Sequence, residues 1–166
     1  MSKFFREITE SIQSGDSTAR LMKYNPTTGE VSAMLKNLAG ATGVACSKDG
    51  KFVLVAEYIG KRIQKYWLQR KKAGKAETII KFTGYPVKVK RNNEGNFWVA
   101  LNSQKEDSSL PQGIKIDCNG EVLDSVDLRR EYNDQYITTV QEHKKLADLD
   151  YHRSAKKCKE LKFLSL

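Results

Sequence analysis

Candidate acid–base residues occur at two places in the 166-residue chain. Glu57 and Tyr58 follow an apolar run over residues 52–56, and Glu142 directly precedes His143. A carboxylate or a Glu–His pair can transfer protons when its surroundings adjust its pKa. Each also has a structural interpretation, which we favour: Glu57 pairs with a nearby Lys or Arg, and Glu142–His143 forms a structural hydrogen bond. Glu57, which ends this run beside Tyr58, is kept as a substrate-pocket candidate.

The chain has three cysteines, none in a CxxC pair. Cys46 lies in an apolar run and is predicted to be a small buried residue. Cys118 lies in a turn, and Cys158 is flanked by lysines that would favour its thiolate if it is exposed. The spacing indicates neither a metal site nor a disulfide framework, and we expect no cofactor.

The formal net charge of +9 is unevenly distributed. Residues 61–91 hold eleven Lys or Arg and one acidic residue, whereas residues 92–143 hold four basic and ten acidic ones. A basic block could bind an anion, an acidic partner or nucleic acid. The alternation of Val and Lys over residues 87–90 instead favours a solvated strand face, so we expect no nucleic-acid partner.

The longest apolar runs, residues 52–56 and 97–101, have five residues each. This is far below the roughly 20 residues that a membrane-spanning helix needs, so no membrane span is expected. The N-terminal residues 1–7 meet charge too early to contain the apolar core of a signal peptide.

Short motifs recur along the chain at an interval of about 45 residues. The turn sequence DGKF at 49–52 returns as EGNF at 94–97, Lys23-Tyr24 returns as Lys65-Tyr66, and GEV at 29–31 returns at 120–122. Between Gly-rich turns, apolar runs predict strands. These runs cover residues 21–24, 52–56, 63–68, 78–82, 97–101 and 114–116.

A repeat of four short strands in 40–45 residues is typical of a β-propeller blade. The chain supplies about two and a half to three blades, although a closed ring needs about four to eight. We therefore predict an all-β partial propeller over residues 1–143, either truncated or completed by partner subunits. Its open blade edges would favour self-association. Residues 144–166 form a divergent basic tail, for which helix and disorder are equally supported.

Several segments resemble the strictosidine synthase family of plants, including its strictosidine synthase-like members. The fold implied by the resemblance is a six-bladed β-propeller, and this chain resembles its middle to late portion. The matching segments are residues 14–28 (SGDSTARLMKYNPTT), 43–58 (GVACSKDGKFVLVAEY), 62–68 (RIQKYWL), 90–100 (KRNNEGNFWVA) and 141–143 (QEH).

The resemblance implies a Pictet–Spengler condensation of tryptamine with the aldehyde secologanin, in alkaloid biosynthesis and without a cofactor. The family's catalytic glutamate lies four residues before the glutamate of the QEH motif, and that position here is Thr138. The family histidine two residues before that catalytic glutamate corresponds to Tyr136. The resemblance also implies that Tyr58 is a substrate-pocket candidate, since it holds the position of a pocket aromatic of the family. A threonine hydroxyl does not titrate near neutral pH. We therefore expect this chain to be inactive alone.

Two alternatives remain open. An ester or lactone hydrolase of the calcium-dependent propeller type would need an oxygen-rich ion site. The family's Pro-Asp-Asn reads Pro86-Val87-Lys88 here, and valine and lysine are poor ligands for a hard metal. The other alternative is a non-catalytic binding or scaffold module.

The resemblance also implies a secretory-pathway location, in the vacuole or endoplasmic reticulum.

Overall fold

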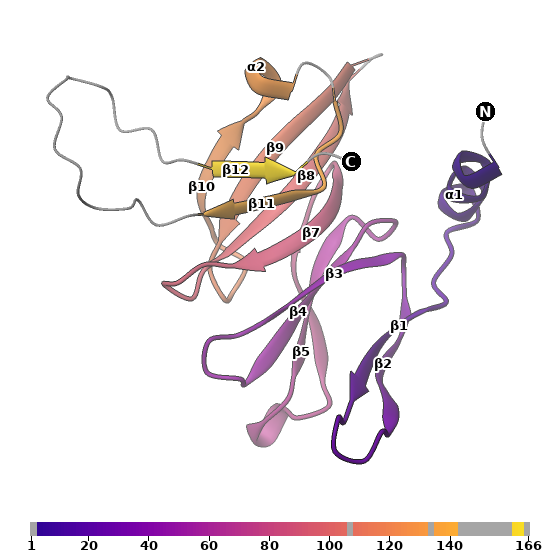
Figure 1. The fold of residues 1–166 in the computed structure, drawn as a ribbon, viewed down its shortest axis with the longest axis vertical. Coiled ribbons are helices and arrows are strands. Elements are labelled where there is room, and N and C mark those ends of the chain that lie inside the picture. Colours follow the sequence, from indigo (N-terminus) through magenta and orange to yellow (C-terminus); the bar gives the residue numbers. More distant parts are fainter. Residues whose placement is uncertain (1–2, 106–107, 133–134, 143–160, 165–166) are drawn as a thin grey trace, which may run out of the picture.

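The computed structural model describes residues 3–105, 108–132, 135–142 and 161–164 (Figure 1). Strands dominate this part of the chain. The elements are α1 (Lys3–Ser14), β1 (Ala19–Tyr24), β2 (Val31–Leu38), β3 (Ala41–Cys46), β4 (Phe52–Glu57), β5 (Arg62–Trp67), β6 (Ala76–Lys81), β7 (Tyr85–Arg91), β8 (Phe97–Lys105), β9 (Ser108–Ile116), β10 (Val122–Asp127), α2 (Arg129–Tyr132), β11 (Thr139–Glu142) and β12 (Leu161–Leu164), with a short 3-10 turn at Arg70–Lys72.

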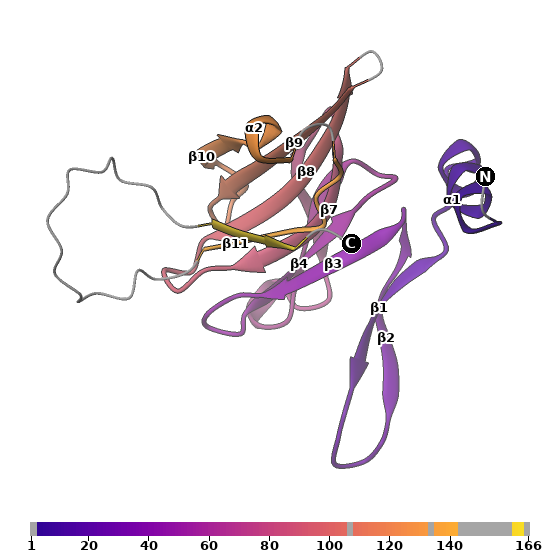
Figure 2. The same cartoon turned by 45° about the horizontal axis from the view of Figure 1, so that its top comes forward.

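Two complete four-stranded sheets form the centre of the molecule (Figures 1 and 2). One has the order β3-β4-β5-β6 and the other β7-β8-β9-β10, and every neighbouring pair is antiparallel. Each sheet therefore follows the chain as a simple meander, which is the order of strands in a propeller blade. The strands predicted from the apolar runs are confirmed.

Two half-sheets lie on either side of this pair. The hairpin β1-β2 precedes the first complete sheet, and β11 pairs antiparallel with β12 after the second. The described residues thus contribute two complete blades and two half-blades.

The apolar core lies between the sheets. All six residues of β4 are buried, so this strand is covered on both faces as its apolar sequence predicts. One face packs against β1-β2 through Val53 and Val55, and the other packs against β7–β10 through Leu54 and Ala56. The rings of Phe52 and Phe97, which recur in the sequence, lie 6.0 Å apart in this second layer.

Glycine permits the close approach of the two complete sheets at two points. Gly43 on β3 lies so close to β7 that an added Cβ would be 2.9 Å from the Cα of Lys88. Gly120, in the turn before β10, has a φ of +89°, and an added Cβ would be 2.3 Å from the carbonyl oxygen of Ile79.

Two predictions are wrong. Cys46 is exposed, because it shares a face with Val53 that the hairpin β1-β2 covers over β4 but not over the end of β3. Leu161–Leu164 forms strand β12, so this part of the tail is neither helical nor disordered. Cys158 and the rest of the tail lie outside the described residues. The helix α1 was not anticipated. No helix in the described part of the chain is long and apolar enough to cross a membrane.

Replacing Gly120 with Ala should destabilise the fold more than replacing Gly50 with Ala. Both glycines have positive φ, but an added Cβ at Gly50 meets nothing within 4 Å. Gly50→Ala should lower the free energy of unfolding by about 1–2 kcal/mol through backbone strain. Gly120→Ala should cost about 1–3 kcal/mol more because the sheets must separate. Urea unfolding measures both, and equal losses would contradict the tight contact.

Candidate functional site

Three tyrosines from three successive sheets gather at one end of the strands. Tyr58 follows β4 and stacks on Tyr85, which begins β7, with ring centroids 4.7 Å apart and an interplanar angle of 26°. Tyr136 lies just before β11 and is 47% exposed. Partial burial, and then the nearby phenols of Tyr136 and Tyr85, raise the pKa of Tyr58 above its usual value. We call these three residues the tyrosine group.

The backbone beside Tyr136 and Thr138 is fixed by a buried asparagine. The side chain of Asn102, near the end of β8, donates to the carbonyl of Ile137 at 2.8 Å and accepts from its amide at 3.0 Å. Ile137 is itself buried against Trp98 and Val140. This clamp fixes the backbone between Tyr136, a member of the tyrosine group, and Thr138, the two positions that the family resemblance singled out.

Glu57 is completely buried at the end of β4 and is held by three donors. Arg62 donates from Nε to Oε1 at 2.9 Å and from a terminal nitrogen to Oε2 at 3.1 Å, and the amide of Ala39 donates to Oε2 at 2.7 Å. The structural interpretation of Glu57 is therefore confirmed. With both oxygens occupied, this carboxylate fixes the start of the first complete sheet and is closed to a ligand.

A cation completes the surroundings of the tyrosine group. The ammonium of Lys61 lies 4.3 Å from the centroid of the Tyr85 ring, within range of a cation–π interaction. Tyr85, Lys61 and Asn102 were not anticipated from the sequence, because their contacts join strands far apart in the chain. The position of Tyr85, directly after a Gly turn at the start of a blade, is the signal that could have identified it.

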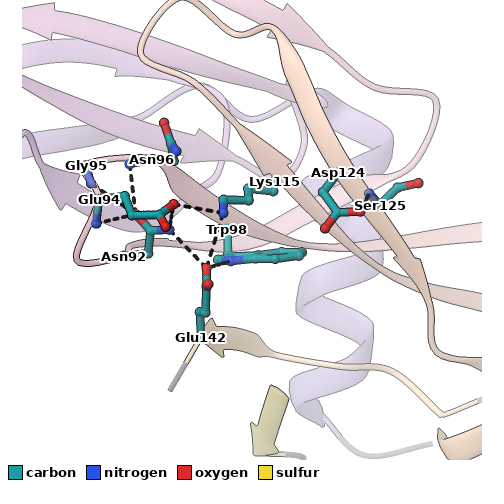
Figure 3. A network of polar contacts seen from close by, with 9 residues as sticks. All are labelled: Asn92, Glu94, Gly95, Asn96, Trp98, Lys115, Asp124, Ser125 and Glu142. Atoms are coloured by element: carbon teal, nitrogen blue, oxygen red, sulfur yellow. Dashed lines mark hydrogen bonds and ion pairs between the residues drawn. The ribbon is translucent and has the colours of Figure 1, made fainter. Parts of the chain in front are cut away.

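A second polar cluster joins β11 to the second complete sheet (Figure 3). One oxygen of Glu142 accepts from the indole of Trp98 at 2.9 Å and from the amide of Asn92 at 3.0 Å, and lies 3.4 Å from the ammonium of Lys115. The side-chain oxygen of Asn92 also accepts from the backbone amides of residues 94–96 and so closes the β7-β8 turn. Glu142 is thus a structural residue that holds one blade to the next, while His143 lies outside the described residues.

The basic block is only partly a solvated face. Lys88 and Lys90 are exposed and Val89 is buried, as the alternation predicted. Lys65 is buried instead, with its ammonium above the rings of Phe52 and Trp67 and donating to the carbonyl of Cys118 at 2.9 Å. This lysine joins the two complete sheets, which the sequence did not reveal. Trp67 and Trp98 both pack between blades, as predicted.

Two other parts of the structure, an open hollow and the segment after Pro86, offer fewer groups for binding or catalysis. A shallow open hollow of about 610 Å³ is lined by residues 10, 11 and 14–18, none of which belongs to the tyrosine group. The described residues contain no group of three or more His, Cys, Asp or Glu side chains that could hold a metal ion. Val87 and Lys88, which follow Pro86 on β7, have no side-chain oxygen that could bind a metal ion.

Solved structures with this fold belong to propeller-like proteins. The chain aligns with a luciferin-regenerating enzyme at a TM-score of 0.60 and 24% identity, over 75% of this chain and 40% of that one. It aligns with a calcium-binding protein, regucalcin from Agrobacterium tumefaciens, at 0.52 and 16% identity, over 68% and 38%. Together with the meander sheets, these likenesses define the chain as a partial β-propeller.

The sequence comparisons give the family. Residues 2–71 match the family model of strictosidine synthase. Strictosidine synthase of Catharanthus roseus is 37% identical over 82% of this chain and 40% of its own length. Strictosidine synthase-like protein 11 of Arabidopsis thaliana is 33% identical over 84% of this chain and 43% of its own. The chain spans about two fifths of these relatives, and over that part the matches confirm the predicted resemblance and support membership of the strictosidine synthase family.

Removing the partner of Glu57 should destabilise the protein strongly. Arg62→Ala would leave a buried carboxylate with only the Ala39 amide as donor, at a cost of about 2–4 kcal/mol. The double variant Glu57→Gln/Arg62→Ala removes the uncompensated charge and should recover part of the loss. Chemical denaturation of the two variants measures this difference. A double variant less stable than Arg62→Ala would contradict a charge-pairing role.

The Glu142 cluster should make stability depend on acid pH. Hydrogen bonds from Asn92 and Trp98, and then the charge of Lys115, hold the pKa of Glu142 below its ordinary value of 4.5. The stabilisation is therefore present above about pH 4.5 and is lost as the pH falls through the lower, folded-state pKa. Glu142→Gln cannot titrate, so its free energy of unfolding should fall less than the wild type's between pH 5 and pH 3. Parallel curves for the two proteins would contradict this role.

Proposed function

We propose that this chain is a strictosidine synthase-like propeller segment that binds a small aromatic ligand and does not catalyse the Pictet–Spengler condensation. The observation that carries the proposal is the side chain at the catalytic position. Thr138 stands there, beside the Asn102 clamp, and Tyr136 stands at the family histidine position. Ile137, the residue between them, is fixed by its buried contact with Asn102.

The condensation requires proton transfer from and to the amine and the ring carbon, for which the family uses a carboxylate. Such general acid–base catalysis is worth about 10²–10⁴ in rate. A hydroxyl of Thr138 cannot carry it. Glu57 cannot replace the missing group either, because it is 0% exposed and already accepts three hydrogen bonds.

The tyrosine group supports binding of an aromatic molecule. The exposed ring of Tyr136 and the stacked pair of Tyr58 and Tyr85 offer aromatic faces and phenolic hydroxyls from three sheets. Lys61 already occupies the face of Tyr85 with its own positive charge. A protonated amine would meet repulsion there, so the ligand we propose is neutral or carries a carboxylate.

The finer properties implied by the family, a six-bladed ring, a role in alkaloid biosynthesis and a vacuolar or endoplasmic-reticulum location, are part of this proposal. The hydrolase alternative has no supporting observation among the described residues, since the segment 86–88 supplies no acidic ligand. The scaffold alternative shares the absence of catalysis and differs in needing a macromolecular partner.

The purified chain mixed with tryptamine and secologanin should form no product above the buffer control. Liquid chromatography with mass detection measures the condensation product, and strictosidine synthase provides the positive control. Thr138→Glu places a carboxylate at the family position and is the informative variant, because a gain of product would assign the loss of activity to this residue. Turnover by the unmodified chain would overturn the proposal.

A further inference from the structure

The two half-sheets at either side of the fold correspond to different halves of a four-stranded blade. β1 corresponds to the third strand of a blade, because Lys23-Tyr24 on β1 recurs as Lys65-Tyr66 on β5, the third strand of the first complete sheet. β2 corresponds to the fourth strand, since the residues that lead into it at 29–31 recur at 120–122, leading into β10. The pair β1-β2 is therefore the outer half of a blade.

β11 and β12 supply the opposite half. β11 follows the fourth strand of the second complete sheet. The turn after β7 is joined to β11 by the hydrogen bond that the side-chain amide of Asn92 donates to Glu142 (Figure 3). Figure 1 shows β11 beside β7, the position that β7 itself holds beside β3. β11 is thus the first strand of a blade and β12, its antiparallel neighbour, the second.

One face of the hairpin β1-β2 is exposed, whereas the corresponding face of each complete sheet packs against a neighbouring sheet. Leu21 faces the first complete sheet and is buried against it, so Met22 and Tyr24 point to the other face. Tyr24 is 62% exposed, whereas Tyr66, its counterpart on β5, is 7% exposed and Ile116 on β9 is 0% exposed. Each covered counterpart is buried by the preceding sheet of a propeller.

We propose that two copies of this 166-residue chain close one ring, in which β11-β12 of each copy pairs with β1-β2 of the other to form a composite blade. Each copy provides two complete sheets, and the two junctions provide one composite sheet each, so the ring has six blades. This is within the range in which propellers close. The second copy also covers the Met22 and Tyr24 face with its β7–β10 sheet.

The strand directions permit this pairing. A blade alternates direction from its first to its fourth strand, and β11-β12 and β1-β2 are each antiparallel pairs. Joining β12 to β1 therefore continues the meander with the order β11-β12-β1-β2. The junction removes the free edges of β1 and β12, which would otherwise remain open to unspecific strand pairing. α1 lies beyond the start of β1 in both views and leaves the length of the strand accessible (Figures 1 and 2).

The mass of the chain in solution tests the proposal. Sedimentation equilibrium over a dilution series should give twice the 18.8 kDa of one chain. Because each copy carries a formal charge of +9, raising the salt concentration should strengthen the association. Tyr24→Lys places a charge in the proposed contact and should give a monomer. Val122→Lys is the matched control, because Val122 is 52% exposed on the outer strand β10 and should leave the dimer intact.

Amide hydrogen exchange tests the strand pairing separately from dimerisation. In the dimer the amides of β1 should exchange more slowly than in Tyr24→Lys, while those of β4 should be equally protected in both, which shows that the variant is folded. A monomer at every concentration overturns the proposal. So does a dimer that Tyr24→Lys leaves unchanged, or one in which the β1 amides exchange as fast as in the variant.

Discussion

The fold depends on a requirement that each sheet be covered on both faces. β4 illustrates it, because all six of its residues are buried, with alternate side chains packed against different neighbouring sheets. A sheet of this kind cannot face water on either side, since each exposed apolar side chain would forgo about 1.5–3 kcal/mol of burial. The blades therefore stabilise one another, and no single blade is expected to be stable alone, because one repeat cannot bury its apolar faces without neighbours.

Buried charges define how the blades stack. Lys65 and Lys115 are 4% and 7% exposed, and each reaches from the third strand of its sheet to a group on a neighbouring element. Glu57 and Glu142 hold the connections before and after the complete sheets. Burying these charges is costly unless their partners are in place. They consequently favour one arrangement of the sheets, and they are unavailable for catalysis.

The sequence predicted what is local and repeated, and missed what depends on distant contacts. The turns at Gly50, Gly95 and Gly120 and the strands between them were found because glycine and alternating apolar residues are local signals. The pairing of Glu57 was also anticipated from nearby basic residues. The burial of Cys46 was predicted wrongly, because its apolar neighbours do not show that one face of β3 is uncovered. Lys65 was predicted to lie on a solvated face, because only the folded structure brings the carbonyl of Cys118 to its ammonium.

The location of the tyrosine group links stacking to function. Its members come from the end of β4, the start of β7 and the residues before β11, so the group exists only when three successive blades are stacked in register. The Asn102 clamp on Ile137 joins the second and third of these blades. A propeller can therefore keep its pocket geometry while the residue at the catalytic position changes, because the scaffold is held by buried groups that never touch a ligand. We therefore expect a change at position 138 to cost this fold little stability, which is consistent with the proposed binding without condensation.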